Sequence, residues 1–296
     1  MLPAGVPCEK AMRMTEAAFD PSLYVDLERF PLHDLAGGRN AEFVARCREM
    51  LAESGACNLQ GFIRPEVVGG LAAEAWALAH LAYDKNTRRN AYFTKDDPAL
   101  PPDHPMRAFF ALRMSQLAND AIPKSAAIQR IYEWDPLTEF VRRVVGLPAL
   151  YRIADPFLAL NLTYLKAGDL QPWHYDHNEF TVTLLLQSAE AGGEFEYAPR
   201  IRSAEDENFE RVGRLFAGSY GDVRQLPRSA GTLTIFKGRH AMHRVTEVQG
   251  KRPRISALLS YDSLPDQFAD DETNAFIYGP RVAAILAARR ADIGRE

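Results

Sequence analysis

The segment from Trp173 to Gln187, which reads WHYDHNEFTVTLLLQ, places a polar triplet directly before an apolar run that suits a buried strand. Within it, His174 and Asp176 are separated by one residue. On an extended backbone two such side chains point to the same side, because side chains alternate with a period of two. The imidazole and the carboxylate can therefore bind one metal ion from one face. An HxD triplet alone arises by chance in many chains, so its meaning depends on the rest of the sequence.

A second histidine and a polar pair complete the pattern. His243 opens the segment HRVTEV, and Arg254 and Ser256 follow after ten intervening residues. Arg254 and Ser256 also alternate onto one face of a strand, where a guanidinium and a hydroxyl together suit a carboxylate. The alternatives are ordinary polar residues on a sheet surface and a surface arginine in a salt bridge. The combined spacing of the histidines, the aspartate, the arginine and the serine disfavours both alternatives.

Two further histidines lie close to the motif. His177 falls on the opposite alternation to Asp176, so it faces a substrate, supports the site from behind or is solvated. His240 precedes its strand in a GRH turn and lacks the spacing to the arginine and the serine. We therefore assign His243 as the second histidine ligand.

The period of the sequence changes near Leu150, where short strands begin to alternate with glycine-rich turns. Residues 203–217 are predicted to form an inserted helix. The pattern predicts an α+β fold whose core, residues 150–265, is a double-stranded β-helix of the jelly-roll or cupin-like type. The predicted strands are 157–166, 180–187, 194–197, 232–236, 243–248 and 254–261.

Residues 1–149 are predicted to form a helical layer on this core. Within it, residues 1–22 have no clear period, and residues 84–107 hold four prolines and many charges. The latter stretch predicts a long irregular loop that acts as a lid. A C-terminal extension, residues 266–296, is expected to contain a helix over 280–290. The helices expected in the N-terminal layer are 40–54, 65–83, 123–132 and 136–145, with a short strand at 57–59.

Charge and cysteine content restrict the class of protein. The net charge is −4 and the pI is about 6.0, so no basic field attracts nucleic acid. Cys8, Cys47 and Cys57 are odd in number and lack CxxC spacing, which favours reduced thiols. A basic start followed by an apolar core is absent from the N-terminus, and no apolar run approaches the roughly 20 residues of a membrane span. We expect a cytoplasmic protein without nucleic-acid or membrane partners, with a homodimer as the default assembly.

Taken together, H-x-D followed by H-x(10)-R-x-S resembles the signature of the Fe(II)/2-oxoglutarate-dependent oxygenases. Two imidazoles and one carboxylate on one face of an octahedral ion leave three positions open for a bidentate 2-oxo acid and dioxygen. The resemblance implies Fe(II), 2-oxoglutarate and O2 as cofactor and co-substrates. His174, Asp176 and His243 would be the metal ligands, and Arg254 and Ser256 would bind 2-oxoglutarate.

One further residue, Tyr164, is a candidate contact for the same co-substrate. It stands on the preceding predicted strand, ten residues before His174. The alternative is that its ring packs in the core.

A narrower resemblance covers most of the chain. The segments AYFTKDDPALPPDHP, IYEWDP, AGGEFEYAPRIRSAEDEN and IFKGRHAMHRVTEVQG are similar to those of the radical amino-acid halogenase/hydroxylase group. In its halogenases a glycine replaces the carboxylate ligand and leaves room for chloride, whereas this chain has Asp176. The resemblance then implies hydroxylation, or desaturation or ring closure, of an unactivated C–H bond, with release of succinate and CO2.

The substrate is expected to be a small polar molecule, a free amino acid or a derivative by family analogy. Arg88 and Arg89 could clamp its carboxylate, with a solvated basic patch as the alternative. Trp134 could line its site, although large aromatics more often pack in cores. His177 stands where the lysine halogenases have a residue that helps to hold the amine, which argues against lysine itself. Acidic candidates for an ammonium group are Asp96, Asp97 and Glu133.

Three rival functions share parts of these features. An oxygenase acting on a nucleic-acid base or a protein side chain predicts an open or basic groove, which the acidic pI disfavours. A cupin-like protein that binds a metal or ligand without oxidation leaves Arg254 and Ser256 without a role. A halogenase is disfavoured by Asp176.

Overall fold

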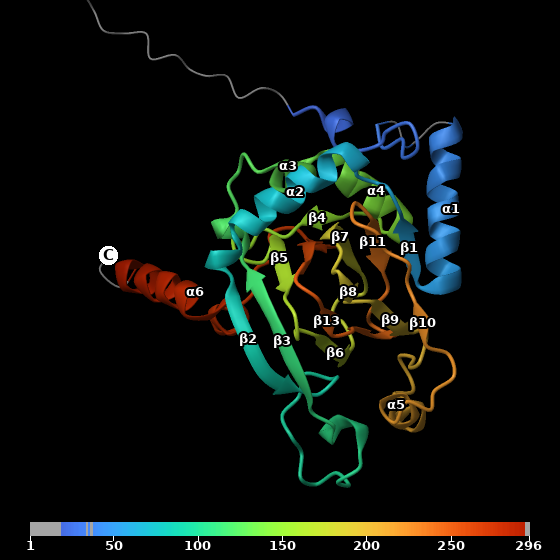
Figure 1. The fold of residues 1–296 in the computed structure, drawn as a ribbon, viewed down its shortest axis with the longest axis vertical. Coiled ribbons are helices and arrows are strands. Elements are labelled where there is room, and N and C mark those ends of the chain that lie inside the picture. The colour runs from blue at the N-terminus through green and yellow to red at the C-terminus, as the bar shows by residue number, and fades with distance from the viewer. Residues whose placement is uncertain (1–18, 34, 36–37, 294–296) are drawn as a thin grey trace, which may run out of the picture.

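The computed structural model describes residues 19–33, 35 and 38–293. Two β-sheets lie face to face, and helices cover the outer side of the larger one (Figure 1). The expected double-stranded β-helix core with a helical layer is therefore confirmed. The arm expected over residues 1–22 and the thiol of Cys8 fall largely or wholly outside the described residues. No described helix has the length and apolar character needed to cross a membrane.

The larger sheet has seven strands and the smaller one has four. The larger sheet contains β1 (Ala56–Leu59), β2 (Tyr83–Arg89), β3 (Phe110–Leu117), β5 (Leu160–Leu165), β7 (Thr181–Gln187), β11 (Leu233–Phe236) and β14 (Arg254–Leu259). Its order is β1-β11-β7-β14-β5-β3-β2, with antiparallel neighbours throughout. The smaller sheet contains β6 (Gln171–His174), β9 (Phe195–Ala198), β10 (Arg224–Gln225) and β12 (Met242–Val245), in the order β10-β9-β12-β6.

Two short strand pairs close the ends of the barrel. They are β8 (Ala191–Gly192) with β13 (Val248–Gln249), and β4 (Tyr151–Arg152) with β15 (Tyr261–Asp262). Single 3-10 turns occur at η1 (Pro21–Leu23), η2 (Ala79–Leu81), η3 (Pro105–Arg107) and η4 (Asn119–Ala121).

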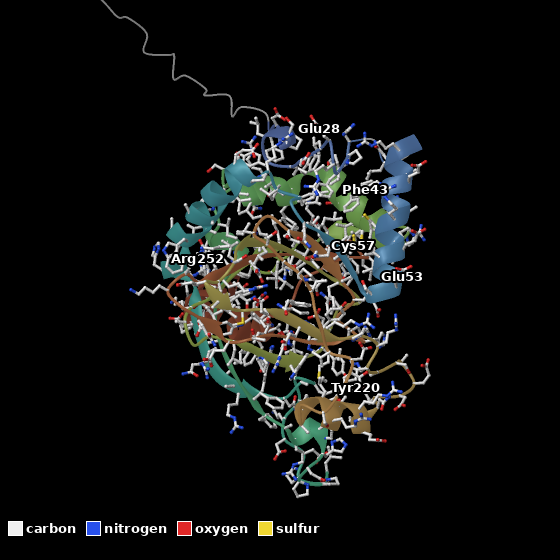
Figure 2. The ribbon with its side chains drawn as sticks, turned by 45° about the vertical axis from the view of Figure 1, so that its right-hand side comes forward. Glu28, Phe43, Glu53, Cys57, Tyr220 and Arg252 are labelled. Carbon is white, nitrogen blue, oxygen red and sulfur yellow. The ribbon has the colours of Figure 1, made fainter. Side chains whose placement is uncertain are left out.

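Four helices pack on the outer face of the larger sheet or at its β1 edge (Figure 1). Pro65 opens one of them, since its fixed φ suits a first helical turn, and Gly146 ends another in the left-handed conformation. Phe43 of α1 and Cys57 of β1 lie in the interface between helix and sheet (Figure 2). These helices are α1 (Gly38–Ser54), α2 (Pro65–Ala77), α3 (Ala127–Glu133) and α4 (Asp135–Val145).

Alternation along the central strands separates the apolar core from the cavity between the sheets. On β14, Ile255 and Ala257 join the core beneath the helices, while Arg254 and Ser256 line the cavity. On β7, the threonines at 181 and 183 likewise line the cavity, whereas the leucines at 184 and 186 pack in the core. The same two strands therefore build both the core and the polar wall of the site.

The expected loop over residues 84–107 is wrong in its first part. Residues Tyr83–Arg89 form β2, the edge strand of the larger sheet, and pair with β3 in the register Tyr83↔Gln116 to Arg89↔Phe110. Charged side chains on both faces hid this strand, because edge strands need little apolar surface. Residues 1–149 thus contribute β1, β2 and β3 to the sheet as well as the helical layer.

Two further helices flank the barrel. The inserted helix α5 (Phe209–Phe216) is shorter than expected, and α6 (Asp271–Ile293) is longer. Gly279 interrupts α6 at φ 74°, where a side chain would collide with the ring of Tyr83, and Pro280 follows it. Tyr278 and Val282 pack against the barrel, while the later part of α6 projects away from it (Figure 1).

Candidate metal centre and substrate cavity

The two histidines of the motif face each other on neighbouring strands of the smaller sheet. His174 ends β6 and pairs with His243 of β12, which brings their ring centroids to 4.1 Å. Asp176 follows in the loop after β6 and not on the strand itself. Its Oδ1 lies 3.9 Å from His174 Nε2 and 3.4 Å from His243 Nε2. One ligand atom from each of the three residues lies within 4.8 Å of the others.

Backbone carbonyls fix the orientation of both imidazoles. His174 Nδ1 lies 2.8 Å from the carbonyl oxygen of Pro172, and His243 Nδ1 lies 3.1 Å from that of Ala241. Each Nδ1 therefore carries the proton, and each Nε2 keeps its lone pair toward Asp176. Burial, reinforced by the nearby His243, lowers the pKa of His174, so its ring stays neutral. A neutral imidazole is the form that binds a metal.

The carboxylate of Asp176 is held from two sides. The hydroxyl of Thr181 donates to its Oδ2 at 2.7 Å, and the backbone N–H of Asp176 donates to the carbonyl of Gly238 at 3.1 Å. Burial acts to raise the pKa of Asp176, but the His243 and His174 imidazoles and the Thr181 hydroxyl outweigh it and lower that pKa. The amide of Gln171 lies 3.2 Å from His174 Nε2, so it would have to yield that atom to a metal. The site thus combines an ionised carboxylate with two Nε2 atoms, a donor set that suits a divalent transition metal.

A cavity of about 180 Å³ opens beside these three residues, between the two sheets. Four cationic side chains line it, but Asp176 is the one carboxylate among the described residues of its wall. Hydroxyls from the central strands and the rings of Phe195 and Phe236 complete the wall. The cations are Lys85, Arg89, Arg228 and Arg254.

Arg254 and Ser256 lie together as the motif predicted. Arg254 Nη1 donates to Ser256 Oγ at 2.7 Å, and both side chains are buried in the cavity wall. Burial lowers the pKa of Arg254 to about 10, with Glu194 acting in the opposite direction. The guanidinium therefore stays charged near neutral pH, and its remaining donors are available to an anion.

A second guanidinium accompanies Arg254. Arg228 donates to Thr183 Oγ1 at 2.9 Å, and its buried Nε has no hydrogen-bond partner among the described residues. Burial and then the charge of Arg254 lower the pKa of Arg228. The sequence offered no signal for this residue, since a single arginine in the loop before β11 has no spacing to the motif. The alternation of Thr181 and Thr183, in contrast, did indicate that this strand contributes hydroxyls to the wall of the cavity.

The two arginines expected to act as a clamp lie in different environments. Arg88 is exposed and donates to the carbonyl of Phe109 at 2.6 Å, outside the cavity. Arg89 points into the cavity, where its Nε and Nη2 are buried without a hydrogen-bond partner in the described chain. Its guanidinium lies 4.5 Å from the ring centroid of Phe93. Burial lowers the pKa of Arg89 to about 10, and Asp176 opposes that shift.

Phe93 brings the loop after β2 over the metal site. Its ring centroid lies 6.0 Å from that of His174 and 4.8 Å from that of His177, which is exposed and does not line the cavity. The backbone at Phe93 is left-handed, at φ 58°. The buried amide of Asn90 fixes this turn, because it accepts from the N–H groups of Tyr92 and Thr94 at 3.1 Å each.

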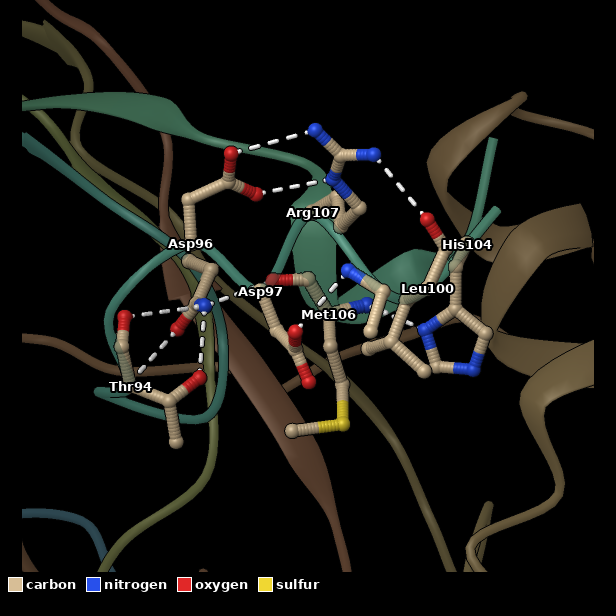
Figure 3. A network of polar contacts seen from close by, with 9 residues as sticks. Thr94, Asp96, Asp97, Leu100, His104, Met106 and Arg107 are labelled. Carbon is tan, nitrogen blue, oxygen red and sulfur yellow. Dashed lines mark hydrogen bonds and ion pairs between the residues drawn. The ribbon is translucent and has the colours of Figure 1, made fainter. Parts of the chain in front are cut away.

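The rest of this loop is tied to itself and to α5. Asn90 Nδ2 also donates to both oxygens of Thr94 and to the carbonyl of Met106. Asp96 forms a bidentate pair with Arg107 at 2.8 and 3.1 Å, and His104 accepts from the N–H of Met106 (Figure 3). The loop also contacts α5, through the rings of His104 and Phe209 at 4.4 Å.

Several predicted residues lie away from the cavity. Tyr164 is fully buried on the opposite face of β5, where its hydroxyl donates to the carbonyl of Ala75 at 2.7 Å. Its ring packs in the core on the side of the strand away from the cavity, which favours the alternative of core packing. Trp134 packs at the junction of α3 and α4. Among the acidic candidates, Asp97 caps the loop at Ala99 and Glu133 pairs with Lys124.

The sequence of this chain matches a known protein family. The profile of the Halogenase D family (HalD) matches residues 39–278. This chain belongs to the Halogenase D family. No curated protein sequence matches it.

This Halogenase D family member is similar in fold to several solved structures. The epimerase SnoN in complex with Fe³⁺ and alpha ketoglutarate aligns with a TM-score of 0.52 at 15% identity, over 78% of this chain and 93% of SnoN. The carbocyclase SnoK of nogalamycin biosynthesis gives 0.51 at 11%, over 73% and 82%. AviO1 from Streptomyces viridochromogenes Tue57 gives 0.51 at 16%, over 76% and 97%. The family match confirms the predicted resemblance to the halogenase group, and the fold is that of these solved structures.

Proposed function

We propose that this Halogenase D family member is an Fe(II)- and 2-oxoglutarate-dependent dioxygenase. It hydroxylates an unactivated C–H bond of a small substrate, a free amino acid or a derivative, and releases succinate and CO2. The gathering of His174, Asp176 and His243 beside a cavity that also contains Arg254 and Ser256 carries the proposal. A protein that binds only a metal would leave the three guanidiniums in that cavity, Arg89, Arg228 and Arg254, without an anion.

The residues divide into a metal set and a co-substrate set. His174 Nε2, His243 Nε2 and the carboxylate of Asp176 would hold Fe(II) and leave adjacent positions open. Bound iron would supply the oxidising chemistry, in which 2-oxoglutarate and O2 give succinate and CO2 while one oxygen atom enters the substrate. Arg254 and Ser256 would bind the distal carboxylate of 2-oxoglutarate, because a buried guanidinium and a hydroxyl suit that group.

Hydroxylation is favoured over halogenation by Asp176. Its carboxylate occupies the place beside the two Nε2 atoms that a chloride ion would need, and the Thr181 hydroxyl holds it there. The family name leaves halogenation as the second candidate. Product mass decides between them: we expect one added oxygen atom, with or without chloride in the buffer.

Arg89 would bind the carboxylate of the substrate. It reaches the cavity near His174, and two of its nitrogen atoms lack a hydrogen-bond partner within the described chain. The loop over residues 90–104 would act as the lid above it, since the ring of Phe93 lies edge-on to that of His174 and faces the Arg89 guanidinium. Closing this lid would exclude water from the reacting carbon.

The first experiment adds Fe(II) and 2-oxoglutarate to the anaerobic protein and records the weak visible charge-transfer band of the chelate. We expect the band in the native protein and its loss in Asp176→Ala and Arg254→Ala. Arg88→Ala is the matched control, because that arginine lies outside the cavity. A folded protein that binds iron but shows no band with 2-oxoglutarate, and releases no succinate in air, would refute the proposal in favour of a cupin-like binder.

A further inference from the structure

The charge of the cavity exceeds what the proposed co-substrates can neutralise. Lys85, Arg89, Arg228 and Arg254 line it, whereas Asp176 is the one carboxylate of the described wall and Glu194, outside that wall, acts on Arg254. Fe(II) and the dianion of 2-oxoglutarate cancel each other, so their binding leaves this excess in place. A buried cation without an anionic partner is costly, which means that a further ligand must supply negative charge.

Two of the four cations, Lys85 and Arg89, have no anionic partner once 2-oxoglutarate is assigned to the other two. Arg228 lies at the same end of the cavity as Arg254, since both side chains also line the adjoining pocket beside Gly193 and Glu194. Both guanidiniums can therefore face the distal carboxylate of 2-oxoglutarate. Arg89 and Lys85 line the side of the cavity away from Arg228 and Arg254. They lie on the same face of β2, four residues and roughly 13 Å apart along the strand. This inference rests on the proposed function, because it assigns 2-oxoglutarate to the first pair.

Lys85 is presented to the cavity by a fixed chain of hydrogen bonds. Its Nζ donates to Gln116 Oε1 at 2.7 Å, which leaves two of its three donors for a ligand. The Gln116 amide is oriented by Asn161, because Gln116 Nε2 donates to Asn161 Oδ1 at 3.0 Å. The hydroxyl of Tyr278 on α6 donates to the same Asn161 oxygen at 2.6 Å. Burial lowers the pKa of Lys85 to about 8, and the charge of Arg89 adds to the shift.

The cavity provides no matching site for a side-chain ammonium group beside Lys85. Its one carboxylate in the described wall, Asp176, is committed to the metal. The acidic side chains of the loop are engaged elsewhere: Asp96 pairs with Arg107, and Asp97 accepts from the N–H of Ala99. A substrate with a basic side chain would place a second cation beside Lys85 and Arg89, which is unfavourable at short range.

We propose that the substrate is a small diacid, with one carboxylate bound by Arg89 beside the iron site and the second bound by Lys85 and Gln116. Within the amino acids and their derivatives, this selects those with an acidic side chain. The carbon that is oxidised then lies on the segment of substrate nearest His174, because Arg89, which lines the same cavity and contacts the ring of Phe93 beside His174, anchors the adjacent carboxylate.

The test measures substrate-stimulated release of CO2 from 2-oxoglutarate labelled at its first carbon. L-glutamate and L-2-aminoadipate are compared with their side-chain amides, and with L-lysine. We expect at least tenfold greater kcat/KM for a diacid than for its amide, and no stimulation by lysine. Stimulation by lysine or by the amides at least equal to that by the diacids would overturn the substrate class while leaving the oxygenase intact. Absence of the charge-transfer band would instead overturn the proposed function.

Variants of Lys85 locate the second carboxylate. We expect Lys85→Met to reduce the diacid-to-amide ratio of kcat/KM to near one, Lys85→Arg to restore it, and Lys85→Glu to favour lysine over the diacids. Lys124→Met is the matched control, since that lysine is exposed and pairs with Glu133 far from the cavity. The charge-transfer band of each variant reports whether its iron site has formed. An unchanged ratio in a Lys85→Met protein that shows the band would refute the assignment.

Discussion

The position of the Asp176 carboxylate depends on Gly238, which offers no ligand atom to a metal. The Cα of Gly238 lies so close to the Asp176 carboxylate that a Cβ at this position would collide with Oδ2, Cγ and Cβ of the aspartate. The backbone there is not left-handed, so the glycine is required by space and not by conformation. The motif alone could not reveal this requirement, because it depends on the approach of two loops.

Gly238→Ala should therefore abolish metal binding without unfolding the chain. The added methyl group would displace the carboxylate from the two Nε2 atoms. Titration with Fe(II) under anaerobic conditions, with circular dichroism as the test of folding, measures both effects. Gly221→Ala is the matched control, since a Cβ there meets nothing within 4 Å. Unchanged iron affinity in the Gly238 variant would show that the loops separate freely.

The lowered pKa of Lys85 predicts a pH dependence for diacid substrates. Below its pKa of about 8 the side chain is an ammonium ion and binds the second carboxylate; above it, the charge is lost. Since kcat/KM reports the free enzyme, it should fall for a diacid as the pH rises through about 8. Arg89 is the charged neighbour that contributes to this shift. The amide analogue and the Lys85→Arg variant should show no such fall in parallel pH profiles, and a fall in all three would assign it to another group.

At the scale of elements, the hairpin of β2 and β3 joins the cavity to its cover. Lys85 and Arg89 line the cavity from β2, and the loop that continues from Arg89 carries Phe93 over His174. The two cations and the loop that contains Phe93 therefore belong to one continuous segment of chain. Prolines and charges in the sequence predicted the loop but concealed the strand, because the pairing of an edge strand is set by its partner in space.

Asn90→Ala should loosen this cover. The substitution removes a buried amide that satisfies two backbone N–H groups and donates to Met106, at a cost of about 1–3 kcal/mol. We expect faster cleavage by protease within residues 90–104, and more 2-oxoglutarate consumed per product formed, because water enters an open site. Lys95→Ala, an exposed substitution in the same loop, is the control. Equal protease rates and equal coupling would show that the turn does not depend on Asn90.

At the scale of the whole molecule, the metal triad could be predicted because its two histidines lie on strands that the fold pairs and the HxD spacing keeps Asp176 beside them, although in a loop and not on the strand. Arg254 and Ser256 followed from the same rule. Arg228 and Gln116 could not be predicted, since they enter the cavity from a loop and from β3, and only the closed barrel brings them together. Tyr164 shows that spacing along the sequence does not fix which face a side chain occupies. It lies ten residues before His174 but packs on the other face of its strand.

The hydrogen bonds from Tyr278 through Asn161 and Gln116 to Lys85 connect the C-terminal helix to the cavity. Asn161 is also held by its donation to the carbonyl of Phe157, so its oxygen keeps the Gln116 amide oriented toward Lys85. The two histidines of the metal site lie on the smaller sheet, outside this series of hydrogen bonds. If Lys85 selects the substrate as proposed, changes on the C-terminal helix would alter substrate range while leaving the histidines in place.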